Sequence, residues 1–300
     1  MKIILEQLLI LYAFLLLGWI LGKKNPRIIP QTGILSFLLV NLFLPAKVFG
    51  TFSRNFTVSY FSLNYRTILI SVCFLIFFHF ASKPLARLFY KEGYMIRVME
   101  YTFTITNYAY MGYALAESVW GEKGLTDLIV FCIPFALYTY TVGYLKLTGS
   151  GKGLRRAINP MTVALLLGIL FGLTAVPIPT SAQSVLTSAS NCVGPLSMLL
   201  TGITLSEFPV KEMLTDKKAY GIILLRLVII PGVIFGVIKL LQLPSHIALP
   251  ALFVSAMPTG LNTIVFPKSV GEDPGPGARL AFLSHLASCV TIPLWLSLIA

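Results

Sequence analysis

The stretch Ala256-Met-Pro-Thr-Gly-Leu-Asn-Thr-Ile-Val-Phe266 lies inside an apolar segment that runs from about residue 247 to residue 266. An apolar segment of this length is expected to form one continuous transmembrane helix. Here, however, Pro258, Gly260 and Asn262 fall within five residues. Proline removes a backbone donor, glycine permits unusual backbone angles, and asparagine brings an amide into hydrocarbon. The stretch therefore predicts a helix that is broken at membrane depth.

A break at membrane depth has consequences for the rest of the chain. Non-helical backbone is tolerated there only where it is buried in protein or lines a cavity. Secondary transporters commonly build their binding site from two such broken helices that face each other. We therefore expect a second break in the other half of the sequence.

The composition is that of a membrane protein. The 300 residues are 56% hydrophobic and only 11% charged, with a mean hydropathy of +0.84, whereas soluble domains are about 25% charged. Apolar runs of membrane-spanning length recur throughout, so we predict an all-α polytopic protein embedded in the lipid bilayer. The ten predicted transmembrane helices lie at about 3–22, 31–50, 66–89, 97–118, 125–146, 158–176, 183–207, 218–241, 247–267 and 278–299.

The net charge of +12 reflects membrane topology, and we predict no nucleic-acid partner. Sixteen Lys and Arg residues lie in or beside the loops after spans one, three, five, seven and nine, against five on the opposite side. Basic residues mark cytoplasmic loops. We therefore predict a multi-pass protein of the cell (plasma) membrane, with both termini outside and the central loop in the cytoplasm.

The two halves of the sequence resemble each other. Leu15-Leu-Leu-Gly-Trp-Ile-Leu-Gly22 recurs as Leu165-Leu-Leu-Gly-Ile-Leu-Phe-Gly172, and Asn41-x-x-x-Pro45 recurs as Asn191-x-x-x-Pro195. Chance is the alternative, because Leu and Gly are common in membrane helices. The equal offset of the matches favours a repeat.

Five spans per half force the second half to insert upside down, which gives a five-plus-five inverted repeat. Its units are residues 1–148 and 158–300, joined by a linker at 149–157. The repeat offset from Asn262 leads to Thr104-Ile-Thr-Asn-Tyr-Ala-Tyr-Met-Gly112 in span four. This stretch has an asparagine and a glycine but no proline, so it predicts a weaker break.

Asn107 and Asn262 are the main candidate site residues. An asparagine amide offers two donors and an acceptor, and the free N–H groups at the start of a half-helix suit a carboxylate. The alternative is that each asparagine only bonds a neighbouring helix. Their repeat-related positions favour a substrate site, to which we also assign Thr106, Tyr108, Gly112, Pro258, Thr259 and Gly260.

Two basic residues lie inside predicted helices. Lys47 either snorkels to the membrane interface, which we favour, or acts as a counter-charge for an anion. Arg226 lies deeper, where a charge is costly, and either attracts an anion or ties two helices together. Two further groups leave alternatives open. His285 and His79 are more typical of helix–helix hydrogen bonds than of proton relays, and the tyrosines of span five line a cavity or form an interfacial belt; these tyrosines are Tyr138, Tyr140 and Tyr144.

The sequence lacks signs of catalysis. The four cysteines lie inside apolar runs without metal-ligand spacing, and the glycine-rich central segment lacks the order of a phosphate-binding loop. We therefore predict a protein that is not an enzyme and has no metal site and no cofactor other than a coupling ion, H⁺ or Na⁺. Glu6, Glu100 and Glu207 lie near helix ends, which favours solvated or interfacial positions. The alternative is that Glu100 or Glu207 carries a coupling proton.

Several motifs in the right order resemble those of the auxin efflux carrier family. They are Asn41-Leu-Phe-Leu-Pro45, Asn159-Pro160, Pro195-x6-Gly202-x2-Leu205, Arg226-Leu-x-x-x-Pro231, Ala256-Met-Pro-Thr259 and Ile292-Pro-Leu-Trp295. The resemblance covers nearly the whole chain. It implies the fold of bile-acid:sodium symporters, in which scaffold helices one, two, six and seven hold transport helices three to five and eight to ten.

The same resemblance implies a function. Family members move organic anions by an elevator-like alternation, and helices four and nine cross at mid-membrane with one asparagine each, which maps onto Asn107 and Asn262. Carboxylates such as malate or malonate, or auxin-like acids, are the implied substrates, and a homodimer through the scaffold is allowed. The missing crossover proline in span four and the presence of Lys47 are departures. A receptor or channel on the same fold is the alternative function.

Overall fold

The computed structural model describes residues 2–91, 93–149 and 158–298, and these residues form an all-helical protein. The predicted linker at 149–157 lies outside the described residues except for Gly149. The α-helices are α1 (Lys2–Lys24), α2 (Thr32–Leu38), α3 (Leu44–Asn55), α4 (Val58–Arg87), α5 (Tyr94–Thr104), α6 (Tyr113–Tyr138), α7 (Tyr144–Thr148), α8 (Pro160–Thr174), α9 (Thr180–Asn191), α10 (Val193–Ser206), α11 (Val210–Thr215), α12 (Lys217–Leu224), α13 (Ile230–Leu241), α14 (Ser245–Ala256), α15 (Asn262–Lys268) and α16 (Gly275–Ser297).

Short segments of tighter or wider helix connect several of them. A 3₁₀ segment, η1 (Pro26–Gln31), precedes α2, and four π segments continue neighbouring α-helices. The π segments are η2 (Leu39–Phe43), η3 (Tyr108–Gly112), η4 (Thr139–Gly143) and η6 (Leu225–Ile229). Single-turn π segments are frequent at functional sites.

The helices are built for a bilayer. Six helical runs in the described residues are long and apolar enough to cross a membrane, and α8 and α14 are apolar but shorter. Large apolar side chains lie on the outside of the protein, for example Leu240 on α13 with 81% of its surface exposed. Such surfaces are stable against lipid tails but not against water. The protein is therefore a multi-pass membrane protein, and the count of ten spans stays a prediction.

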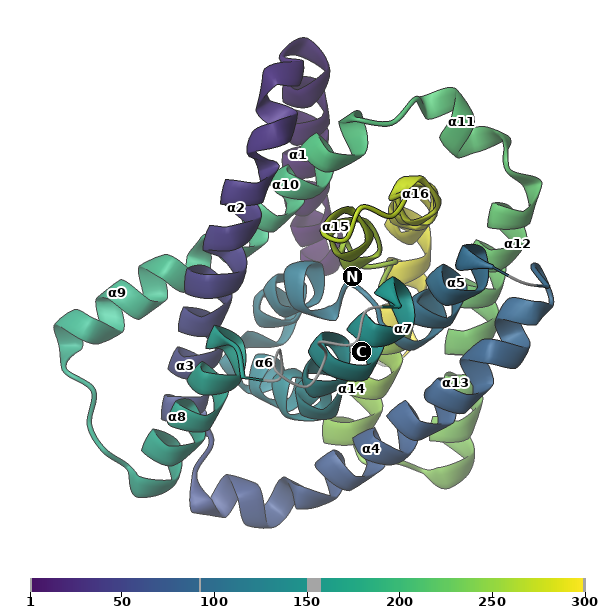
Figure 1. Ribbon diagram of the computed structural model, residues 1–300. Coiled ribbons are helices and arrows are strands. Elements are labelled where there is room, and N and C mark those ends of the chain that lie inside the picture. The colour runs from purple at the N-terminus through teal and green to yellow at the C-terminus, as the bar shows by residue number, and fades with distance from the viewer. Residues whose placement is uncertain (1, 92, 150–157, 299–300) are drawn as a thin grey trace.

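Two groups of helices can be followed in Figure 1. In the first group, α1 packs along α10, and α3 packs against α8 and α9. In the second group, α4 packs on α5, while α14 packs on α13 and α16. Helix α6 contacts members of both groups.

Close helix contacts in the first group depend on glycine. A Cβ atom added to Gly18 would lie 2.1 Å from the carbonyl oxygen of Leu199, and one on Gly168 would lie 2.8 Å from the Cβ of Phe52. Small residues let membrane helices approach backbone to backbone. Gly18 and Gly168 occupy equivalent places in the two matching sequence segments, so in both halves a glycine at this place allows close helix packing.

We expect Gly18→Ala to destabilise the protein by about 1–3 kcal/mol, because the new methyl group overlaps the backbone of α10. Thermal unfolding of the purified variant measures the change. Gly236→Ala on α13 is the matched control, because a Cβ there meets nothing within 4 Å. Equal unfolding temperatures for the two variants would contradict the packing of α1 on α10.

Both breaks suggested by the sequence are present. Helix α5 ends at Thr104, and Ile105 is extended with φ −117° and ψ 134°. Helix α14 ends at Ala256, and Met257 is extended with φ −69° and ψ 147°. Pro258 explains the second break, because it cannot donate to the helix. At the first break the β-branched run Thr104-Ile-Thr106 has weak helix preference, and pairing with the other break replaces the lost helical bonds.

Candidate functional site

The two breaks meet and bond to each other in the interior. Thr106 and Thr259 form an antiparallel bridge, and the backbone N–H of Asn107 donates to the carbonyl oxygen of Pro258 over 2.8 Å. The backbone N–H of Thr259 donates to the hydroxyl oxygen of Ser284 on α16 over 3.0 Å. We call this meeting point, residues 105–107 and 257–260, the crossover. Backbone N–H groups of each broken helix donate to a different segment here, whereas in a continuous helix they would donate to carbonyls of the same helix.

Several polar atoms at the crossover lack partners. The hydroxyls of Thr106 and Thr259 and the Oδ1 atom of Asn107 are buried without a hydrogen bond in the described structure. A buried polar atom left unpaired costs about 1–3 kcal/mol. Unpaired groups gathered at one place mark a site where strain or an absent partner has a role.

Asn107 contacts α16 instead of open space. Its Nδ2 atom lies 3.1 Å from Nε2 of His285, and Nδ1 of His285 lies 2.7 Å from the carbonyl oxygen of Ala281. The Asn107 side chain is almost fully buried. In this conformation Asn107 therefore bonds a neighbouring helix, which is the alternative to a substrate contact that the sequence left open.

Arg226 on η6 ties the two broken helices together. Its Nε donates to the carbonyl oxygen of Thr102 over 3.1 Å, and its Nη1 donates to that of Ser255 over 2.5 Å. Both carbonyls lie at the C-terminal ends of half-helices, where they have no helical partner and carry partial negative charge. With 1% of its surface exposed, the guanidinium is compensated by these carbonyls. The sequence left open whether Arg226 attracts an anion or ties two helices together. In the structure it ties two helices together.

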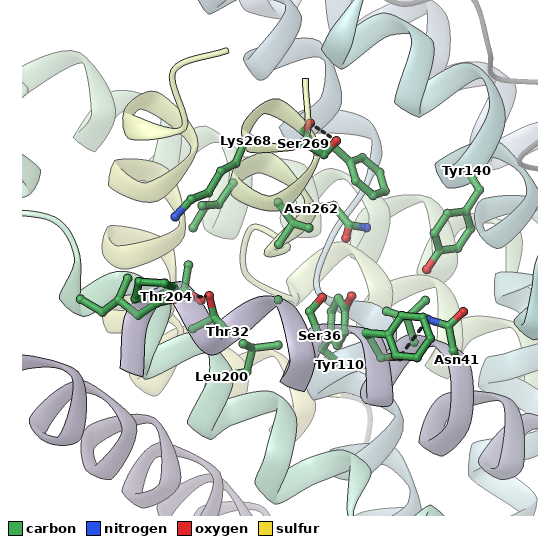
Figure 2. A pocket seen from close by; sticks show the side chains of 18 residues that line it. Thr32, Ser36, Asn41, Tyr110, Tyr140, Leu200, Thr204, Asn262, Lys268 and Ser269 are labelled. Atoms are coloured by element: carbon green, nitrogen blue, oxygen red, sulfur yellow. Dashed lines mark hydrogen bonds between the residues drawn. The ribbon is translucent and has the colours of Figure 1, made fainter. Parts of the chain in front are cut away.

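A cavity of about 470 Å³ lies between α2 and α10 on one side and α15, η3 and η4 on the other. Figure 2 shows Asn262 of α15 with its amide directed into it, between Lys268 on one side and Tyr140 of η4 on the other. The Asn262 amide also lies beside the hydroxyl of Tyr101. The remaining polar lining residues are Thr32, Ser36, Asn41, Tyr110, Thr204 and Ser269.

Of the eight residues assigned to a substrate site from the sequence, only Asn262 lines the cavity. Thr106, Pro258, Thr259 and Gly260 are buried at the crossover, and Tyr108 and Gly112 are buried in η3, which follows Asn107. None of these six residues lines the cavity. A Cβ on Gly260 would lie 3.3 Å from the carbonyl oxygen of Thr106, so a small residue there allows the close approach. These residues shape the site rather than contact the cavity.

Sequence reasoning missed most of the cavity lining. Tyr110, Thr204 and Ser36 come from three different elements, and no local pattern connects them. Asn41 belongs to the repeated Asn-x-x-x-Pro motif and to a family motif, and neither predicts that it lines a cavity. The interfacial belt proposed for span five is wrong, because Tyr138, Tyr140 and Tyr144 are largely buried. Tyr140 instead lines the cavity, which is the other alternative from the sequence.

Lys47 does not snorkel to the interface. It is 2% exposed, and its ammonium group donates to Glu117 of α6 and, over 3.2 Å, to Ser190 of α9. The expectation failed because a carboxylate on a neighbouring helix compensates the charge inside the protein, which hydropathy along one span does not reveal. Arg54 forms a similar pair with Glu122 over 2.8 Å. Both pairs join α3 to α6.

Two other carboxylates are also paired with lysines, whereas the buried Asp127 of α6 accepts a hydrogen bond from the hydroxyl of Tyr60 and forms no ion pair in the described structure. Glu100 binds Lys146 over 2.9 Å, and Glu207 binds Lys268 over 2.8 Å at the rim of the cavity. No group of three or more metal-ligating side chains occurs within residues 2–91, 93–149 and 158–298. Lys268 thus lines the cavity as one member of an ion pair, and the other polar groups of the lining are neutral amides and hydroxyls.

Comparison with known proteins relates the whole chain to transporters. A family model described as "Membrane transport protein" matches residues 3–156 and 152–296. The chain is 21% identical to the "Uncharacterized transporter YfdV" of Escherichia coli (strain K12), over 97% of this chain and 96% of that protein. The protein of the same name from Shigella flexneri matches with the same identity and coverage.

Proposed function

The chain belongs to the auxin efflux carrier family of membrane transport proteins, and from that premise we propose that it is a secondary active transporter of small organic anions. The cavity beside the crossover is its substrate site, and alternating access is of the elevator type. The single observation that supports this most is the position of Asn262, which comes from a broken helix and presents its amide to a cavity between α2 and α10 on one side and α15, η3 and η4 on the other.

The size and lining of the cavity support a small organic acid. Ligand sites of about 300–1,000 Å³ are typical of small molecules, with a few polar groups among apolar walls, and this cavity measures about 470 Å³. The amide of Asn262 and the hydroxyls of Tyr110 and Tyr140 are donors suited to a carboxylate. Helix α15 has only seven residues, so these side chains, rather than a helix dipole, carry the recognition in our proposal.

The position of the cavity supports an elevator movement. One wall comes from α2 and α10, and the other from α15, η3 and η4. We assign α1 to α3 and α8 to α10 to the scaffold, and α4 to α7 and α12 to α16 to the transport unit. A substrate at this boundary would travel with the transport unit while the scaffold stays in place.

The helix pairs support the five-plus-five inverted repeat. Exchanging the two halves turns the contact of α1 with α10 into the contact of α8 with α3, and both contacts are extensive. Residues 1–148 and 158–300 are therefore the two units of our proposal. The crossover, where the fourth and ninth spans meet, lies where a repeat of this kind places its binding site.

The orientation follows from the charged loops. The rim of the cavity contains Ile29 and Lys268, whose loops belong to the Lys/Arg-rich side, while the pairs of Lys47 and Arg54 join α3 to α6 toward the other side. With basic loops in the cytoplasm of the cell, the cavity opens inward and both termini lie outside. A homodimer through the scaffold remains an expectation from family resemblance.

A thermal-shift screen of the purified protein tests this proposal. Dicarboxylates, indole acids and bile acids are compared with their uncharged amides. We expect at least one acid, and not its amide, to stabilise the protein, by about 2.7 kcal/mol at a hundred times its dissociation constant. A folded protein that responds to no acid, or equally to acid and amide, would contradict the anion site and favour a receptor or channel.

A further inference from the structure

His285 of α16 lies beside the crossover and does not line the cavity. It is 2% exposed on α16, and the preceding residue, Ser284, accepts the backbone N–H of Thr259. The His285 ring reaches Asn107 at the other break. Adjacent residues of α16 therefore hold both breaks, one through a backbone amide and one through a side-chain amide.

The hydrogen bonds determine the form of the ring. The carbonyl oxygen of Ala281 only accepts, so Nδ1 of His285 must donate to it over 2.7 Å. In the neutral ring Nε2 is then an acceptor, and it receives the Nδ2–H of Asn107 over 3.1 Å. This arrangement leaves Oδ1 of Asn107 buried without a partner on the opposite side of the amide.

Protonation would reverse this arrangement. A proton bound to the Nε2 lone pair turns Nε2 into a donor that faces the two donor hydrogens of Asn107. A half-turn of the amide removes the conflict, because it places Oδ1 on the new N–H. The same half-turn moves the NH₂ group to the place where the unpaired oxygen was. Asn107 would then present donors, rather than an acceptor, away from His285.

An anion at this site also needs a positive charge. An unpaired charge at membrane depth is costly, yet the basic groups nearest to the site are already compensated. Lys268 pairs with Glu207, Lys47 pairs with Glu117, and Arg226 binds two carbonyls. His285 has no charged partner in the described structure, so its protonation adds a charge that an anion can balance.

We propose that His285 is the proton-binding site of this transporter and that the His285–Asn107 pair couples one proton to one carboxylate. The proposal rests on the anion transport proposed above. One proton from the water on one side binds Nε2, the amide of Asn107 turns, and the carboxylate binds. On the other side both leave, Nε2 regains its lone pair, and the amide turns back.

Other titratable groups around α16 do not take this role. The packed elements carry Tyr12 on α1, Tyr101 on α5, Arg226 on η6, His246 on α14 and Lys268 on α15, with Cys289 on α16 itself. Helices α11 and α12 add Lys211, Glu212, Lys217, Lys218 and Tyr220. Tyr12 binds Ser288 over 2.6 Å, and Cys289 donates to the backbone carbonyl of His285. At the ends of α5, α12 and α16, Glu100, Asp216 and Arg279 are paired elsewhere. Within the described residues none of these side chains is bonded to the imidazole.

The first test needs no ligand. The full-length protein is labelled with ¹⁵N at histidine and asparagine, and the three histidines are assigned by His79→Gln, His246→Gln and His285→Gln. We expect His285 to be the Nδ1–H tautomer at about pH 8, and the side-chain amide of Asn107 to shift with the same midpoint as the ring. An Nε2–H tautomer, or an Asn107 amide that ignores the titration of His285, would overturn the switch.

The second test measures binding of indole-3-acetate and malonate between about pH 6 and pH 8. One coupled proton tightens binding by up to about tenfold for each unit of decreasing pH. His285→Gln should remove this slope, because its amide oxygen still accepts from Asn107 but takes up no proton. The acid's own titration is the same for both proteins, so the difference in slope reports His285. His79→Gln is the control and should keep the wild-type slope.

The outcomes separate the two proposals. An equal slope in wild type and His285→Gln overturns proton coupling through this residue while leaving anion transport in place. Weaker binding at every pH with an unchanged slope shows a purely structural histidine and also overturns it. If neither acid binds to either protein, the proposed anion site fails with these probes, and the NMR titration still decides whether the switch exists.

Discussion

Asn262→Ala is expected to weaken binding of a transported acid by about 5- to 150-fold, which corresponds to the loss of 1–3 kcal/mol for one hydrogen bond to a charged group. Asn262 begins α15 just after the crossover, and its amide reaches the cavity. The substitution leaves a bound carboxylate facing alanine. The protein itself should remain stable, because the structure assigns no main-chain bond of the crossover to this side chain. Isothermal titration with the acid found in the screen gives the change in dissociation constant.

Asn64→Ala is the matched control for this experiment. Asn64 is also a membrane asparagine, but its amide donates to the carbonyl oxygen of Tyr60 on its own helix, outside the cavity. We expect its affinity for the acid to equal that of the wild type. Unchanged binding in Asn262→Ala, or an equal loss in both variants, would contradict a substrate site at the cavity.

Arg226→Met has the second large effect, on stability. The substitution keeps much of the side-chain volume but leaves the carbonyls of Thr102 and Ser255 buried without a donor. Each unpaired carbonyl costs about 1–3 kcal/mol, partly offset because a buried charge is removed. We expect a clear fall in unfolding temperature, with faster hydrogen exchange at the backbone amides of Asn107 and Thr259, because the two half-helices are no longer held together.

Arg66→Met controls for the loss of an arginine, since Arg66 is exposed on α4 and contacts only Tyr65 in the described structure. It should unfold like the wild type. A different result for Arg226→Met would change its assignment. Normal stability and exchange, combined with lost acid binding, would show that Arg226 acts as a counter-charge for the anion and not as a tie.

The sequence predicted the helical breaks because their causes are local. Pro258 interrupts backbone bonding wherever it stands in a helix interior, and Asn262 is costly in hydrocarbon unless it has a partner. The repeat then located Asn107 without any proline nearby. The lack of proline is explained by pairing, since the chain at Thr106 is held open by Thr259, a contact between residues far apart in sequence.

The cavity could not be predicted in the same way. Its lining comes from α2, α10, α15 and two π segments, so membership depends on how distant helices pack. Compensation of charge is equally non-local. Lys47 pairs with Glu117 on another helix. Arg226 donates to backbone carbonyls that lack helical partners because two helices break. The hydropathy of a single span does not reveal partners on other helices. For this reason the sequence favoured the membrane interface for Lys47.

Counterflow in proteoliposomes tests the central claim most directly. Vesicles that contain the purified protein are loaded with the acid identified by the screen and diluted into a trace of the same radiolabelled acid. A carrier with one crossover site predicts transient, saturable accumulation of label that depends on internal acid, is lost in Asn262→Ala and persists in Asn64→Ala. Flux that does not saturate and needs no internal acid, or a steady ionic conductance, would contradict the account and identify a channel.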